Sequence, residues 1–148
     1  MSIRRFSVAH WACLALSLAV GVLVLSGCAI DGSHHAAAEP TVNVTERDFR
    51  LSAPTRLPAG DVTLSVSNRG PMEHELIVVR QRGRRLPLRS DGLTINEERI
   101  ASAEVGALEP GEPGVRQLSF RLAPGTYEMF CNMAGHFMAG MHRGFVVK

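Results

Sequence analysis

The feature that most constrains the fold of this 148-residue chain is a short segment near its C-terminus, residues 131–141. Four residues separate Cys131 from His136, and four more separate His136 from Met141. The segment thus carries a thiolate, an imidazole and a thioether, three donors that together suit a soft or borderline metal ion. A fold for this chain has to bring these three side chains to one point in space.

The donor types indicate copper. A trigonal mononuclear copper site takes two histidines and one cysteine, with a long axial bond to a methionine. The C-terminal segment lacks only one of these ligands, so a second histidine has to come from elsewhere in the chain. His74, which follows the turn at Gly70-Pro71, is the obvious candidate, because the other histidines lie near the N-terminus or directly beside Met141.

The two ligand segments resemble those of the cupredoxin family of blue copper proteins, in which an upstream strand provides one histidine and a C-terminal loop provides the other ligands. The loop spacing is similar to that of rusticyanin-type and sulfocyanin-type members and longer than that of plastocyanin. The resemblance covers residues 41–148 and implies an all-β Greek-key sandwich or barrel of seven or eight strands. It implies one type 1 copper ion held by His74, Cys131 and His136, with Met141 as the weak axial ligand.

The N-terminus has the pattern of an export signal. Arg4 and Arg5 precede an apolar run from about Val8 to Ser26. The sequence Leu25-Ser26-Gly27-Cys28 resembles the lipobox of bacterial lipoproteins, in which the cysteine is lipidated and becomes the new N-terminus. A retained membrane-spanning helix is the alternative, because the apolar run is long enough to span a bilayer.

These patterns divide the chain into three parts. We expect residues 1–28 to be a lipoprotein signal peptide, residues 29–40 to be a flexible tether and residues 41–148 to be the folded domain. The domain would then be exported and attached to a bacterial membrane through Cys28, either in the periplasm or at the outer cell surface.

The cysteine count agrees with an exported metal site. Cys13 and Cys28 belong to the leader, so Cys131 is left without a disulfide partner in the mature domain. A lone thiol is vulnerable in an oxidising compartment, and binding to a metal as thiolate would explain its presence.

Charge argues against a nucleic-acid partner. The chain has 16 basic and 14 acidic residues, and the two numbers become equal once Arg4 and Arg5 are removed. A nucleic-acid-binding domain would be expected to show a basic excess.

Hydrophobic alternation predicts strands on both sides of a less regular region at 80–113. In the first half Val42, Val44, Phe49 and Leu51 alternate with polar residues, with a break at 46–48 that is consistent with a bulge.

The less regular region itself carries helix and loop signals. A capping box at residues 94–97 predicts a short helix that runs to about Val105 and ends at Gly106, and residues 109–114 are predicted to be a loop. The arginines between residues 80 and 89 are interpreted as a solvated loop face in preference to a docking patch for an acidic partner.

A copper site filled by four protein ligands has no open position for a substrate, so the sequence predicts an electron carrier, not an enzyme. By its resemblance to the family, a redox protein that donates or accepts an electron would dock on an apolar patch around His136, which would be the electron port. The residues of this expected patch are Met72, Met133, Phe137 and Met138. The chain is expected to be a monomer.

A protein for periplasmic copper trafficking or resistance is the alternative function, because the domain carries five methionines and thioethers suit copper(I). The cysteine thiolate favours the electron carrier, since a delivery protein would use a more open site. A copper enzyme would need further histidines for a second copper centre. A structural zinc site is disfavoured by the methionine at axial spacing.

Overall fold

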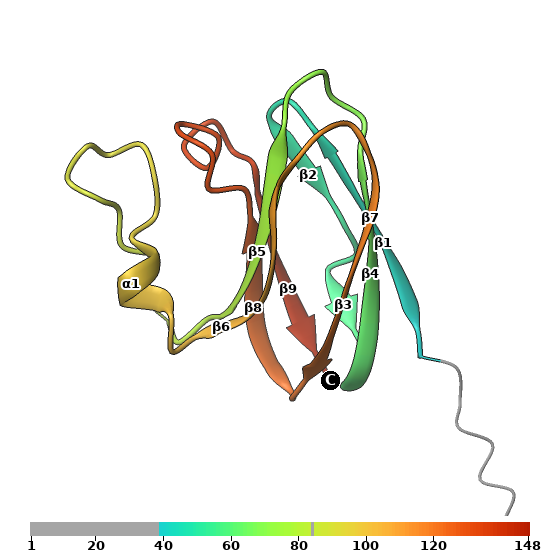
Figure 1. Ribbon diagram of the computed structural model, residues 1–148. Coiled ribbons are helices and arrows are strands. Elements are labelled where there is room, and N and C mark those ends of the chain that lie inside the picture. Colours follow the sequence, from blue (N-terminus) through green and yellow to red (C-terminus); the bar gives the residue numbers. More distant parts are fainter. Residues whose placement is uncertain (1–38, 84) are drawn as a thin grey trace, which may run out of the picture. The chain divides into compact units, whose positions relative to one another are not determined.

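The computed structural model describes residues 39–83 and 85–148, which form nine strands and one short helix (Figure 1). The strands are β1 (Thr41–Arg47), β2 (Arg50–Ser52), β3 (Arg56–Leu57), β4 (Gly60–Asn68), β5 (His74–Arg80), β6 (Glu104–Gly111), β7 (Gly114–Leu122), β8 (Gly125–Phe130) and β9 (His142–Val147), and the helix is α1 (Glu97–Ile100). The expected signal peptide, its Cys28 and nearly all of the expected tether lie outside the described residues. Within the described part of the chain, no helix has the length and hydropathy needed to cross a membrane.

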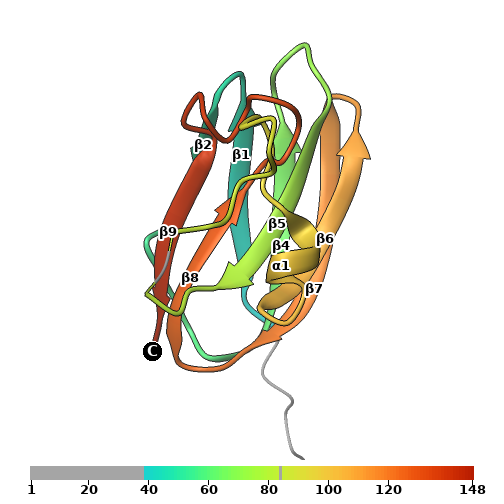
Figure 2. The same cartoon turned by 90° about the vertical axis from the view of Figure 1, so that its left-hand side faces the viewer.

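The strands form two sheets that face each other as a sandwich (Figures 1 and 2). One sheet has the order β2-β1-β4-β7, and the other has the order β3-β9-β8-β5-β6. Most neighbours are antiparallel, but β1 runs parallel to β4 and β3 runs parallel to β9. The predicted all-β sandwich is therefore confirmed in its open form, but it has nine strands where the sequence predicts seven or eight. Two of the nine, β2 and β3, are edge strands of only three and two residues.

The core between the sheets follows from the alternation in the sequence. Along β4, the side chains of Val62, Leu64 and Val66 are fully buried, while the residues between them are partly accessible. Successive side chains of a strand point to opposite faces, so a two-residue repeat of apolar residues gives one buried face.

The strand β5 is buried on both faces. Leu76 and Val78 belong to the inner core, whereas Ile77 and Val79 belong to a second apolar cluster under the connection between β5 and β6. His74 begins this strand on the inner side and is completely buried. The outer cluster therefore fixes the strand that carries the first candidate metal ligand.

The region at 80–113 contains less loop and less helix than the sequence predicts. The helix α1 ends at Ile100, and the prediction that it runs to about Val105 is wrong, because β6 already begins at Glu104. The predicted loop at 109–114 is also wrong, since β6 and β7 leave only two residues between them. Pairing with β6 provides hydrogen-bond partners for the backbone groups at the open edge of β5. A polar helix in this place would leave those groups without partners.

The break at 46–48 is a hairpin turn and not a bulge. Residues 45–47 of β1 pair with residues 50–52 of β2, which leaves Asp48 and Phe49 as the two turn residues. Phe49, which the alternation predicts to be buried, is 43% exposed for this reason. The hairpin signal was missed because neither turn residue is a glycine or an asparagine.

Three connections meet at one end of the sandwich, the upper end in both views (Figures 1 and 2). They are the β1–β2 turn, the β4–β5 connection and the C-terminal segment between β8 and β9. The candidate metal ligands lie at this end.

Candidate metal centre

The structure brings His74, Cys131 and His136 together in one cluster. His74 is the first residue of β5, Cys131 follows β8 directly, and His136 lies in the loop before β9. One possible donor atom from each residue lies within 4.8 Å of the other two. All three side chains are buried, with His136 only 4% exposed.

The side chain of Cys131, directly after strand β8, points into the core. Tyr127, Met129 and Cys131 occupy its inner side, as the alternation predicts, and all three belong to the inner core. The hydroxyl of Tyr127 donates a hydrogen bond of 2.8 Å to the carbonyl oxygen of Ala123, which forms a tyrosine corner at the start of the strand.

The distances within the cluster suit one metal ion. Nδ1 of His74 lies 3.3 Å from Nδ1 of His136, and Sγ of Cys131 lies 3.4 Å from Nδ1 of His136 and 4.0 Å from Nδ1 of His74. Metal–nitrogen bonds of about 2 Å at trigonal angles would place two nitrogen ligands roughly 3.5 Å apart. The three donors therefore lie close enough together to hold a single ion, and Nδ1 of each histidine would be the atom that binds it.

Met141 lies next to this cluster in the fold. It is completely buried in the same apolar core as Cys131. Its carbonyl oxygen accepts a hydrogen bond of 3.0 Å from the N–H of Cys131, and its own N–H donates one of 3.0 Å to the carbonyl oxygen of His136. Gly135 and Gly140 allow this compact loop, because both have a positive φ. Its role as the axial ligand stays a prediction.

Burial favours the neutral forms of Cys131 and His136. Burial raises the pKa of the Cys131 thiol to about 11, and the backbone N–H groups of Glu75 and Met133 act in the opposite direction. Burial, followed by the neighbouring His74, lowers the pKa of His136. A metal ion that binds the thiolate therefore displaces a proton from Cys131.

Asp48 fixes the tautomer of His74 and was missed from the sequence. Its Oδ1 lies 2.8 Å from Nε2 of His74, so Nε2 carries the proton and its N–H donates a hydrogen bond to the carboxylate. The lone pair of Nδ1 is then free for a metal ion. No local signal points to this pair, since the two residues are 26 positions apart in the sequence and only the folded β1–β2 turn brings them together.

Asn132 links the ligand loop to the connection between β5 and β6. Its Oδ1 accepts a hydrogen bond from the N–H of Ile95 at 2.5 Å, and its Nδ2 donates to the carbonyl oxygen of Ile95 at 3.1 Å and to Glu97 at 2.6 Å. Strand β5, which begins with His74, pairs antiparallel with β8, which precedes Cys131. Burial raises the pKa of Glu75 to about 7, and the backbone N–H of Asn132 acts to lower it.

The expected apolar patch is only partly exposed. Met72 and Met138 are exposed, whereas Met133 packs against the inner core and Phe137 against the outer cluster. Phe49, which sequence reasoning did not assign to the patch, lies edge-on to the ring of His136, with the ring centroids 4.9 Å apart.

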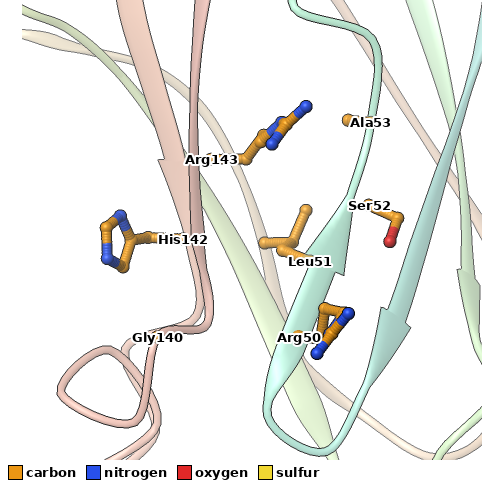
Figure 3. A pocket seen from close by; sticks show the side chains of 7 residues that line it. All are labelled: Arg50, Leu51, Ser52, Ala53, Gly140, His142 and Arg143. Carbon is orange, nitrogen blue, oxygen red and sulfur yellow. The ribbon is translucent and has the colours of Figure 1, made fainter.

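A pocket beside the ligand loop does not open onto the metal cluster. It lies between β2 and the start of β9, and Figure 3 shows the side chains that line it. These are Arg50, Leu51, Ser52, Ala53, Gly140, His142 and Arg143. None of these residues is one of the four expected ligands.

Comparison with solved structures finds copper proteins with the same architecture. An auracyanin from Roseiflexus castenholzii matches with a TM-score of 0.54 at 17% identity, over 76% of this chain and 99% of that chain. Auracyanin A, a "blue" copper protein from Chloroflexus aurantiacus, matches with a TM-score of 0.53 at 18% identity, over 73% and 98% of the two chains. Rusticyanin from Thiobacillus ferrooxidans matches with a TM-score of 0.53 at 17% identity, over 75% and 79%. No family model matches the chain, and no curated protein matches its sequence.

Matches at such low identity show a shared fold, and the ligand cluster supplies the chemistry. The sheet order, the tyrosine corner and the placement of a histidine, a cysteine and a second histidine at one end of the sandwich have all been described above. The chain therefore has the cupredoxin fold, and its His74, Cys131 and His136, with Met141 beside them, fit a single type 1 copper ion.

Proposed function

We propose that this protein is a blue copper electron carrier that passes single electrons between redox proteins. The observation that carries the proposal is the buried cluster of two histidines and one free cysteine, with a buried methionine beside it. Copper held by such a set alternates between Cu(II) and Cu(I).

The residues of the chain would keep the site in one geometry in both oxidation states. His74 is fixed by β5 and by its hydrogen bond to Asp48. His136 and Met141 are fixed by backbone hydrogen bonds within the loop. Because burial excludes water and leaves no substrate position, outer-sphere electron transfer is favoured over catalysis at the metal.

Electrons would enter and leave near His136. The exposed apolar side chains at this end of the sandwich include Phe49, Met72 and Met138, and Phe49 contacts the imidazole directly. Apolar side chains of this kind suit brief docking of a redox partner, because weak electron-transfer complexes bury little surface. We propose donor and acceptor proteins that dock here one after the other, with the carrier acting as a monomer.

We further propose that the domain works outside the cytoplasm on a lipid anchor at Cys28. The lipobox-like sequence at residues 25–28 supports this location, as does a lone thiol that is protected by burial. Mass spectrometry of the protein purified from a bacterial membrane would detect a diacylglyceryl group on Cys28, and an N-terminus upstream of residue 28 would contradict it.

The test of the electron carrier is the visible and EPR spectrum after addition of one equivalent of Cu(II). We expect an intense thiolate-to-copper band in the visible spectrum and a narrow hyperfine splitting in the EPR spectrum, because the thiolate of Cys131 would bind the copper directly. Cys131→Ser should abolish the band. His142→Gln, which changes a histidine next to the ligand loop that is not a ligand, should retain it.

The alternative outcome would identify the other function. A colourless Cu(II) complex with an ordinary EPR signal, from which a chelator removes the copper readily, would contradict the electron carrier and favour copper trafficking.

A further inference from the structure

We propose that the β1–β2 turn sets the reduction potential of the bound copper. The carboxylate of Asp48 strengthens His74 as a ligand and thereby lowers this potential. The inference rests on the proposed copper site and concerns Asp48 as a positioning residue, since Asp48 acts through His74 and does not reach the metal position itself.

The geometry gives His74 an anionic partner on the side away from the metal. Oδ1 of Asp48 lies 2.8 Å from Nε2 of His74, whose side chain is fully buried, while the side chain of Asp48 is 19% exposed. A carboxylate that accepts the N–H of a metal-bound imidazole makes the imidazole a stronger donor and fixes its orientation. A stronger donor stabilises the more highly charged Cu(II) relative to Cu(I).

Gly70 in the β4–β5 connection provides the space for this pair. A Cβ added at Gly70 would clash with Oδ1 of Asp48 and would lie 3.2 Å from Nε2 of His74. The N–H of Gly70 donates a hydrogen bond of 3.0 Å to Oδ1 of Asn68, which holds the connection in place. The carboxylate and the imidazole therefore meet only because this position lacks a side chain.

The neighbouring turn residue acts on the other histidine. Phe49 lies edge-on to His136 and covers it, so that His136 is only 4% exposed although it lies in a loop. Exclusion of water from the cluster weakens dielectric screening, and the charge of Asp48 then acts more strongly on the metal position. Two consecutive residues of one turn thus contact the two histidine ligands.

The test is the reduction potential of the full-length, copper-loaded Asp48→Asn protein, measured by voltammetry. Asparagine keeps an oxygen acceptor at the same place and removes only the charge. We expect the blue band to persist and the potential to rise. A loss of roughly 10- to 100-fold in the preference for Cu(II) over Cu(I) corresponds to a rise of about 60–120 mV at 59 mV per tenfold change.

Asp61→Asn is the matched control, because Asp61 is an exposed carboxylate that pairs with Arg121 at the other end of β4. Its potential should stay at the wild-type value. A blue Asp48→Asn protein whose potential equals that of Asp61→Asn would overturn the proposal and leave the electron carrier intact. Absence of the blue band from the wild-type protein would instead contradict the proposed function.

Gly70→Ala provides a second, independent variant. It keeps the carboxylate but displaces it from His74, so we expect a rise in potential that is not additive with that of Asp48→Asn. If Asp48→Asn does not take up copper, the Gly70→Ala protein decides the question, and an unchanged potential there overturns the proposal.

Discussion

At the scale of single residues, different contacts fix the proposed ligands in place. Asp48 fixes the ring of His74 through a side-chain hydrogen bond, whereas Met141 is fixed by hydrogen bonds of its own backbone. The thioether of Met141 can therefore be removed without loss of the contacts that close the loop. This separates the effect of the sulfur atom on a bound metal from its effect on the fold.

Met141→Leu is expected to keep the blue band and raise the reduction potential. The three strong ligands remain in place, but the axial donor that helps to stabilise Cu(II) is lost. Each tenfold loss in Cu(II) affinity relative to Cu(I) would raise the potential by about 59 mV. Voltammetry measures the shift, and Met129→Leu, a second buried methionine of the same core, is the control with an unchanged potential. An unchanged potential in Met141→Leu as well would show that this thioether is not a ligand.

At the scale of elements, the connection between β5 and β6 supports the metal loop from outside. Asn132 binds both backbone groups of Ile95, and the N–H of Gly135 donates a hydrogen bond of 2.9 Å to the carbonyl oxygen of Leu93. The connection also supplies Ile95 and Ile100 to the cluster that covers the outer face of β5. Loop and connection are thus expected to open together.

Asn132→Ala is expected to loosen both segments. The substitution leaves the buried N–H and carbonyl groups of Ile95 without their partner, and each such group costs about 1–3 kcal/mol. We expect the free energy of unfolding to fall by roughly 2–6 kcal/mol in denaturant titrations. Amide hydrogen exchange should become faster in residues 93–103 and in the metal loop. Asn43→Ala, at an exposed position of β1, should change neither quantity.

The elements also show what sequence reasoning can and cannot reach. Alternation predicts the buried faces of β4, β5 and β8, because each strand has a clear apolar side. The hairpin of β1 and β2 could not be predicted, because its turn lacks the usual turn residues. The strand β6 could not be predicted, because its position depends on pairing with β5, which is distant in the sequence. The same limit applies to the site. The spacing in residues 131–141 points to three ligands, but the contacts of Asp48 and Phe49 with the histidines exist only once the turn has folded.

At the scale of the whole domain, burial that protects the metal cluster also encloses carboxyl groups. Glu46 is completely buried between the sheets at the metal end. Nη2 of Arg116 lies 3.4 Å from Oε2 of Glu46 and donates a hydrogen bond of 2.9 Å to the carbonyl oxygen of His74. Among the described residues, Oε1 of Glu46 has no hydrogen-bond partner. Burial is the largest cause that raises the pKa of Glu46 from 4.5 to about 7, and Arg116 opposes it.

This shift makes the stability of the copper-free domain depend on pH. A carboxyl group with a higher pKa in the folded chain than in the unfolded chain binds its proton more tightly when folded, so its contribution to stability falls as the pH rises from 4.5 to about 7. Glu46→Gln removes this contribution. Relative to wild type, the variant should therefore gain stability with rising pH across this window, by up to about 3 kcal/mol, and gain nothing further above it.

Denaturant titrations of reduced, copper-free protein between pH 4 and 8 measure this difference. Glu75, whose pKa is also raised to about 7, stays in both proteins and cancels in the comparison. A constant difference for Glu46→Gln would mean that Glu46 has the same pKa in the folded and the unfolded chain, because Arg116 then fully offsets the effect of burial. In that case the ion pair between the sheets, whose arginine also holds the backbone of His74, would persist at every pH well above 4.5.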